Sequence, residues 1–150
     1  MDSFESKLDM LLTETYNSIS KVEERNLRES GINVTISEVH LIEAVGNQEC
    51  ATVSSLSKAL GITMASVTIA VTKLSERGFI LKDKNPEDKR SVHLSLTRQG
   101  VRVYRVHRYF HRRMVRAVVT GLSDKERDLI YSTIDRLNNF FKKSVKESIS

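Results

Sequence analysis

The sequence of 150 residues contains no tryptophan, one cysteine, Cys50, and one proline, Pro86. A single cysteine excludes an internal disulfide and any zinc cluster built from several cysteines. With four tyrosines and five phenylalanines, the chain has few aromatic side chains on which unpaired bases could stack. These shortages argue against a disulfide scaffold, a cysteine-type zinc finger and a protein that binds single-stranded nucleic acid.

Long apolar runs and catalytic signatures are also missing. The sequence has no run of about 18 apolar residues, and its first ten residues, MDSFESKLDM, are polar and acidic. We therefore expect no membrane partner, no secretory signal and a cytoplasmic location. The sequence also lacks a glycine-rich phosphate loop, a Gly-x-Ser-x-Gly elbow and a His-Glu-x-x-His motif, so we expect no enzymatic activity.

The charge that is present is unevenly distributed. Residues 1–49 carry ten acidic and four basic side chains, whereas residues 82–116 carry three acidic and eleven basic side chains. A segment this basic is expected to bind a polyanion such as duplex DNA, although an acidic protein would satisfy the same field. A DNA-binding protein and a non-catalytic module for an acidic partner are therefore both open.

Apolar periodicity and capping residues predict six helices. The first helix, over about residues 2–30, is marked by Phe4, Leu8, Leu11, Leu12, Thr15, Ile19 and Val22. The starts of the other five helices are predicted by hydroxyl caps at Thr35, Thr52, Thr63, Thr97 and Ser123. Left-handed glycines are expected to end three of the helices, at Gly46, Gly61 and Gly78.

Between the fourth and fifth helices the period changes to two. Val92, Leu94 and Leu96 alternate with polar residues, and Ile80 and Leu81 can supply a partner strand. The stretch between them, KDKNPEDKRS, is highly charged and contains the turn signal Asn-Pro. The sequence therefore predicts a two-stranded hairpin with a charged tip.

The stretch 56–70, LSKALGITMASVTIA, has the apolar spacing and turn glycine of a helix-turn-helix. Its core would consist of Leu56, Leu60, Ile62, Val67 and Ala70. The predicted DNA contacts, on this unit and on the hairpin, are Ser55, Lys58, Met64, Ser66, Thr68, Ile69, Thr72, Lys73, Lys84, Asp88, Lys89 and Arg90.

The chemistry of these contacts predicts how sequence would be read. The second helix offers hydroxyl and apolar groups but no Arg, Asn or Gln for bidentate base contacts, so we expect a preference for A·T-rich sites and a strong dependence on salt. Arg90 could enter the minor groove beside this helix, with its guanidinium held by Asp88.

This order of elements, together with the triplet Asp88-Lys89-Arg90 and the following Leu96-Thr97-x-x-Gly100, resembles the MarR family of winged-helix regulators. The resemblance implies one domain over residues 1–150 with a mainly α fold. A winged helix-turn-helix with a two-stranded β wing would occupy about 35–97. Long dimerisation helices, over about 2–30 and 98–148, would flank it. It also implies a homodimer that binds a double-stranded operator and regulates transcription.

Shorter segments, Ile36–His40, Val92–Thr97 and Val106–Met114, resemble the FabT-type repressors of fatty-acid synthesis within this family. That resemblance implies no required cofactor, an acyl chain as effector, and acyl carrier protein as a partner. The expected effector pocket is lined by His40, His107, Phe110, His111 and Met114.

The histidines also support a zinc-responsive alternative. His107 and His111 are four residues apart and therefore share one face of a helix, which suits two ligands of one metal ion. A similar layout belongs to AdcR-type members of the family, which implies a ligand set of Glu24 or its neighbour Glu23 with His40, His107 and His111. An arginine stripe is either a solvated face or a surface for an acidic carrier protein or DNA phosphates: Arg98, Arg102, Arg105, Arg112 and Arg116.

Overall fold

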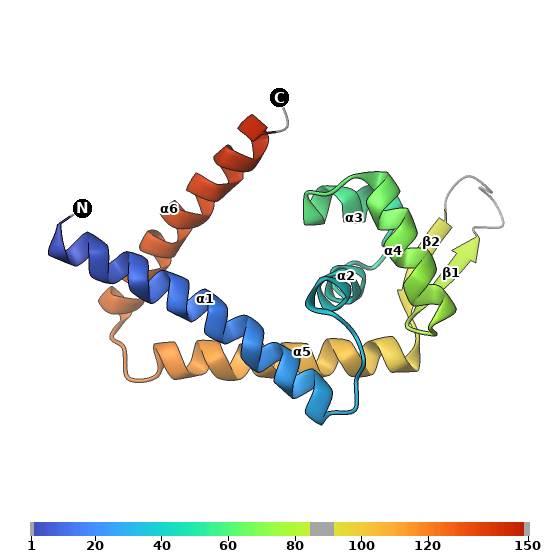
Figure 1. Ribbon diagram of the computed structural model, residues 1–150, viewed down its shortest axis with the longest axis horizontal. Helices are drawn as coiled ribbons and strands as arrows, with labels where there is room; N and C mark the ends of the chain where they lie inside the picture. The colour runs from blue at the N-terminus through green and yellow to red at the C-terminus, as the bar shows by residue number, and fades with distance from the viewer. Residues whose placement is uncertain (1, 85–91, 149–150) are drawn as a thin grey trace. The chain divides into compact units, whose positions relative to one another are not determined.

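The computed structural model describes residues 2–84 and 92–148. In this part of the chain six helices and one antiparallel hairpin follow one another (Figure 1). Their bounds are α1 Ser3–Glu29, α2 Ile36–Gly46, α3 Val53–Leu60, α4 Met64–Glu76, β1 Ile80–Lys84, β2 Val92–Leu96, α5 Arg98–Val119 and α6 Asp124–Ser148. The predicted mainly α fold, with a two-stranded wing between the fourth and fifth helices, is confirmed.

The chain divides into two compact units, residues 1–110 and residues 111–150. The first unit contains α1 to α4, the hairpin and the first half of α5. The second unit contains the rest of α5 and all of α6. The predicted DNA contacts all belong to the first unit.

Side-chain caps begin the helices where the sequence predicts them. Thr35 and Glu38 form a reciprocal capping box at α2, and Thr52 and Ser55 form another at α3. The Thr63 hydroxyl accepts the N–H of Ser66 at the start of α4. Because the first backbone N–H groups of a helix have no partner within it, each cap stabilises its helix by about 1 kcal/mol.

Gly61 and Gly78 have positive φ angles of 65° and 78°, as predicted for helix-ending glycines, but Gly46 does not. Gly46 is the last residue of α2, and Asn47, in the right-handed region, caps the helix. A Cβ atom at Gly46 would lie 2.7 Å from Cδ2 of Tyr104. The glycine is therefore required by the close approach of the Tyr104 ring and not by a left-handed turn.

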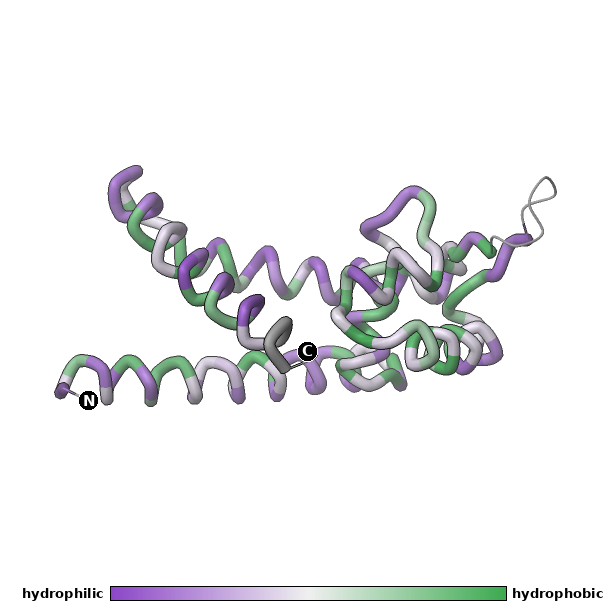
Figure 2. The backbone as a smooth tube through the Cα atoms, turned by 90° about the horizontal axis from the view of Figure 1, so that it is seen from above, coloured by the Kyte–Doolittle hydropathy of each residue, from purple (hydrophilic) through white to green (hydrophobic). Residues whose placement is uncertain are grey.

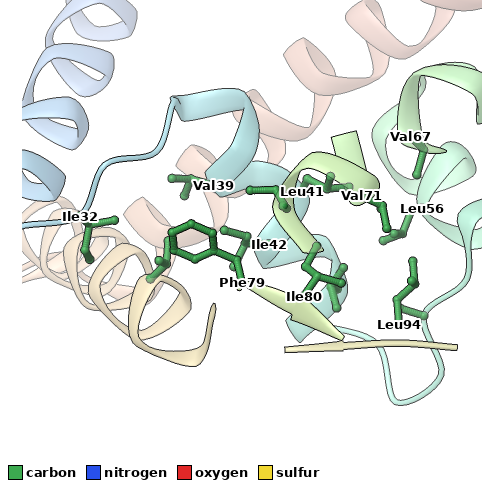
Figure 3. Close-up of a cluster of buried hydrophobic side chains, with 14 of the residues drawn as sticks. Ile32, Val39, Leu41, Ile42, Leu56, Val67, Val71, Phe79, Ile80 and Leu94 are labelled. Atoms are coloured by element: carbon green, nitrogen blue, oxygen red, sulfur yellow. The ribbon is translucent and has the colours of Figure 1, made fainter. Parts of the chain in front are cut away.

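The core of the first unit is centred on α2 and is covered by α4, the hairpin and α5 (Figure 3). Val39, Ile42, Leu56 and Val67 are fully buried, whereas Ile62, predicted to join them, is 44% exposed. Ile62 lies in the turn before α4, where its carbonyl accepts a hydrogen bond from the Ser57 hydroxyl at 2.6 Å. The turn is thus held by a hydrogen bond from the Ser57 side chain to the Ile62 backbone, and the Ile62 side chain is largely left in solvent.

The hairpin pairs in a regular antiparallel register, with Ile80 opposite Leu96 and Lys84 opposite Val92. The outer edge of β2 is joined to the segment before α3, because the Leu94 N–H donates to the Ala51 carbonyl at 2.8 Å. Leu94 is buried and points into the core. These contacts attach the wing firmly to the helix-turn-helix.

The two long terminal helices contrast with this core. Along α1, which is fully described, only Glu23 and Leu27 are buried. Apolar and polar residues alternate along α1 and along α6 (Figure 2), and most of the apolar ones are exposed, among them Phe4, Leu8, Leu11, Tyr16, Leu129, Phe140 and Phe141. No single helix in the described residues has the length and apolarity of a membrane span; α3 and α4 together would, but they form a pair bent by 112°.

Candidate nucleic-acid interface

Helices α3 and α4 meet at a bend of 112°, which is the geometry of a helix-turn-helix. Gly61 ends α3 in the left-handed conformation, and Thr63 begins α4 two residues later. Leu56 and Val67 are fully buried, while Leu60 and Ala70 pack partly buried against the same core. Four of the five predicted core positions therefore contribute to it.

The exposed face of α4 lies opposite Val67, Val71 and Leu74, which are buried. Met64 and Ile69 are large apolar side chains on this helix, and they are 54% and 71% exposed. Four of the predicted base-contacting residues lie on this exposed surface: Met64, Ser66, Thr68 and Ile69.

The hydroxyl groups of Ser66 and Thr68, on the exposed face of α4, are already engaged with the helix and its cap. Thr68 Oγ1 donates to the Met64 carbonyl at 2.8 Å, and Ser66 Oγ lies 2.9 Å from Thr63 Oγ1. A hydroxyl that donates its proton still offers two lone pairs. In this arrangement Thr68 is thus an acceptor toward any ligand, and the donor becomes free only when the hydroxyl rotates away from Met64.

The predicted DNA contacts outside the exposed face of α4 differ in whether their polar groups are already bonded within the protein. Ser55 Oγ accepts the Thr52 N–H at 2.9 Å and donates to the Thr52 carbonyl, so it is committed to the cap of α3. Lys58 and Lys84 are exposed. The Lys73 ammonium lies 3.1 Å from Glu38 Oε1, although its side chain is 63% exposed. Asp88, Lys89 and Arg90 lie outside the described residues.

Lys82 is a basic residue of this surface that the sequence interpretation missed. Its ammonium donates to Thr72 Oγ1 at 2.9 Å and so joins β1 to α4. The contact places an exposed cation beside the helix and gives Thr72, predicted to contact DNA, a structural partner. The sequence contained a signal for Lys82. Because side chains in a strand alternate between its two faces, Lys82 lies on the same face as Lys84, which was predicted to contact DNA.

Glu38 contacts three groups near the end of α4 and the start of α2. Arg77 Nη1 donates to its Oε1 at 2.7 Å, and the Thr35 N–H donates to its Oε2 at 2.9 Å. Burial raises the pKa of Glu38, but the hydrogen bonds from Thr35, Arg77 and Lys73, with the nearby Arg77 charge, lower that pKa below its ordinary value. Glu38 is therefore held as a carboxylate at neutral pH.

A second polar cluster joins α1, α2 and α5. His107 is buried, with Nδ1 3.2 Å from Glu23 Oε1 and Nε2 3.1 Å from Glu43 Oε2. The ring of His40 meets the His107 ring edge-on at a centroid distance of 5.8 Å. Of the two carboxylates predicted for a metal site, Glu23 is buried and Glu24 is exposed. The carboxylate from α1 that faces His107 is therefore that of Glu23.

The remaining predicted effector residues all lie on α5. Phe110 ends the first unit and is partly buried, while His111 and Met114, also partly buried, belong to the second unit. The predicted arginine stripe is exposed over both halves of α5: Arg98, Arg102, Arg105, Arg112 and Arg116. Arg102 also has a structural role, because its Nη2 donates to the Ser30 carbonyl at 2.7 Å.

A bent helix pair with a buried seam, an exposed second helix and an attached β wing define a winged helix-turn-helix protein. A family model described as the MarR family matches residues 34–92. The chain is 30% identical over 117 residues to the HTH-type transcriptional regulator YkoM of Bacillus subtilis, covering 75% of this chain and 72% of YkoM. The chain therefore belongs to the MarR family of DNA-binding transcriptional regulators.

Further relatives support the family and the fold. The chain is 30% identical over 80 residues to YhjH of Bacillus subtilis, a match that spans 46% of that regulator's length. Among solved structures, Streptococcus pneumoniae FabT in complex with DNA is similar with a TM-score of 0.84 and 31% identity, covering 93% of this chain and 98% of FabT. The regulator SlyA, with a TM-score of 0.72 and 14% identity, shares the fold.

Proposed function

We propose that the protein is a ligand-responsive transcriptional repressor that reads its operator with the exposed face of α4. The observation that carries this proposal is the exposure of Met64 and Ile69 on a helix whose other face is fully buried. These apolar groups, on a helix that is anchored by its other face, are available to a binding partner. The dimensions of the B-DNA major groove admit such a helix.

The side chains on this face predict the mode of reading. Met64 and Ile69 can contact thymine methyl groups, and Ser66 and Thr68 can hydrogen-bond to base edges. Lys58, Lys82 and Lys84 are exposed cations for phosphates. Arg90 and Lys89, on the wing tip, are proposed for the minor groove and for a phosphate respectively, with Asp88 orienting Arg90.

We propose a homodimer as the DNA-binding species. Phe4, Leu11 and Tyr16 of α1 are more than half exposed, and a second copy of the same chain would cover them. Two-fold symmetry then places two copies of α4 about one helical turn of DNA apart, so the operator should contain matched half-sites.

For the effector and the regulated genes, the similarity to FabT favours an acyl chain and the genes of fatty-acid synthesis. The polar cluster at His107 ties α1 and α5 to α2, so a ligand that binds beside it could alter how α2 and the attached α4 are held. The exposed arginines Arg98, Arg102 and Arg105, together with the partly buried Val101, form a surface that suits an acidic carrier protein that delivers the chain.

Zinc sensing is the second candidate, favoured by the 3.2 Å separation of two buried potential ligands, Glu23 Oε1 and His107 Nδ1. An N–O separation of this size suits a hydrogen bond and also two ligands of one tetrahedral zinc ion. Equilibrium dialysis against zinc distinguishes the two: stoichiometric zinc that is lost in His107→Ala supports sensing, and no zinc in the wild type rejects it.

A selection experiment tests the proposed function itself. Fragments of the source genome are mixed with the purified protein, and the retained duplexes are sequenced and measured by fluorescence anisotropy. We expect A·T-rich duplexes with matched half-sites and an affinity that falls steeply with salt. Equal binding to all duplexes would contradict sequence-specific reading. Binding to no duplex would instead favour a protein-interaction module for an acidic partner.

A further inference from the structure

The carboxylate of Glu38 connects the start of α2 to the end of α4. Its Oε2 accepts the Thr35 N–H at 2.9 Å and completes the capping box of α2. Its Oε1 accepts from Arg77 Nη1 at 2.7 Å and lies 3.1 Å from the Lys73 ammonium. The buried Glu38 side chain thus joins the capping box of α2 to two cations at the end of α4, Lys73 and Arg77.

Arg77 is held on more than one side. Besides Glu38, its guanidinium donates through Nη2 to the Asn33 carbonyl and lies 5.3 Å from the centroid of the Phe79 ring. Asn33 lies between α1 and α2, so Arg77 bonds both to this connecting segment and, through Glu38, to α2. A planar guanidinium with several fixed donors sets direction as well as distance.

These polar bonds complement the apolar packing of α4. Val67, Val71 and Leu74 bury α4 against the core, but apolar contacts have little directional preference. A recognition surface works only when its groups are held to within about 0.5 Å and 10–20° of the productive geometry. The bonds from Glu38 to Arg77 and Lys73 are directional and lie at the end of α4, so they are suited to setting its rotation about its axis and the direction in which Thr68 and Ile69 point.

We infer that Glu38 is a positioning residue for the reading helix, and that it determines selectivity among duplexes more than affinity for duplex DNA in general. The inference rests on the proposed reading role of α4. Glu38 itself faces the interior, so it would act through Arg77 and Lys73 and not by contact with a base.

The contact between Glu38 and Lys73 should also affect binding to unrelated duplex, in the opposite direction. Its ammonium is partly neutralised by Glu38, while its side chain extends into solvent on the proposed DNA-facing helix. Removal of the Glu38 charge would free this ammonium for phosphates. Binding to unrelated duplex should then become stronger while preference for the operator declines, a combination that simple unfolding cannot produce.

The test compares two substitutions at the start of α2. Glu38→Gln keeps a capping-box acceptor for Thr35 and removes the charge that binds Arg77 and Lys73. Thr35→Ala removes the cap hydroxyl at the same helix end and leaves Glu38 Oε1 in place. Both are measured by anisotropy on the selected operator and on an unrelated duplex, from about 50 to about 200 mM salt.

For Glu38→Gln we expect the ratio of operator affinity to unrelated affinity to fall about tenfold. The salt slope on unrelated duplex should increase in magnitude by up to about 0.9, the value for one additional phosphate contact. Thr35→Ala should keep the wild-type ratio and slope. Arg77→Gln, which breaks the same link from α4, should reproduce the loss of selectivity, and the double variant Glu38→Gln/Arg77→Gln should lose little more.

A wild-type ratio in folded Glu38→Gln and in folded Arg77→Gln would overturn the inference, as would an equal loss of selectivity in Thr35→Ala. Circular dichroism and a melting curve establish that each protein is folded at the assay temperature. If Glu38→Gln does not fold, Arg77→Gln decides alone. Failure of the proposed function has a different signature, because the wild type itself would then show no preference for any duplex.

Discussion

The lobe from α2 to β2 and the helix α1 differ in how completely one copy of the chain covers their apolar side chains. Val39, Ile42 and Leu56 of the lobe are fully buried, whereas Phe4 and Tyr16 of α1 are each 72% exposed. The lobe therefore has its own core within one chain, while the exposed apolar face of α1 is the surface that we propose a second copy covers. Substitutions in the lobe should act on folding, and substitutions along α1 should act on assembly.

The largest effect is expected in the core of the lobe. Leu56→Ala would leave a cavity between α3 and α4 and lower the free energy of unfolding by about 3 kcal/mol. Leu81→Ala removes the same atoms from a wing position that is 49% exposed, and should change stability by less than about 1 kcal/mol. Urea denaturation followed by circular dichroism measures both, and equal losses would contradict the distinction between buried and exposed positions.

The assembly of α1 should respond to charge. Leu8→Glu with Leu11→Glu places two carboxylates on one exposed apolar face, and burying them against a second copy is unfavourable. We expect the dimer dissociation constant to rise by at least about 100-fold, with the core of the lobe still folded. Sedimentation velocity over a concentration series measures the dissociation constant, with Lys7→Glu as the control. A dimer that the Leu8→Glu/Leu11→Glu variant leaves unchanged would assign the interface to another surface.

The two regions meet at a polar cluster, and its removal should cost less than a core cavity. His107→Leu takes away the imidazole that faces both Glu23 and Glu43, and loss of a buried hydrogen-bonding partner destabilises by about 1–3 kcal/mol. His40→Ala, at an exposed position beside it, should change stability by less than about 0.5 kcal/mol. Similar urea midpoints for the two variants would show that the His107 bonds contribute little.

The smallest effect is the pH dependence contributed by Glu38. Because the pKa of Glu38 is lower in the folded protein than its ordinary value of 4.5, folding favours the carboxylate. Its contribution is complete above that ordinary value and is lost as pH falls through the folded pKa. The stability difference between wild type and Glu38→Gln should therefore shrink from about pH 6 to about pH 3. A difference that stays constant would show that the charge is not what stabilises α2.

Local signals in the sequence predicted the elements well. Hydroxyl caps such as Thr35 and Thr52, and the left-handed Gly61, act within a few residues, so their pattern is visible without a fold. Gly46 was misread because the same residue type also allows close packing, here against Tyr104, which lies far along the chain.

Contacts between residues far apart in the sequence were harder to predict from it. The pairs Glu38–Arg77, Lys82–Thr72 and His107–Glu43 depend on how the helices and β1 pack, and a local pattern does not specify the partner in each pair. The sequence did indicate that Glu23, and not Glu24, faces the interior. Glu23 lies one helical turn before Leu27, the buried apolar residue of α1, and therefore shares its face. The wing tip with Asp88, Lys89 and Arg90 remains a prediction.

The most direct test of the account is the operator affinity of a properly folded dimer carrying Thr68→Ala and Arg90→Ala together. Alanine favours the helix at position 68, so the substitutions should leave the fold intact. The account predicts that preference for the operator over an unrelated duplex falls by at least about 100-fold. Unchanged affinity and selectivity in that dimer would show that neither α4 nor the wing reads DNA.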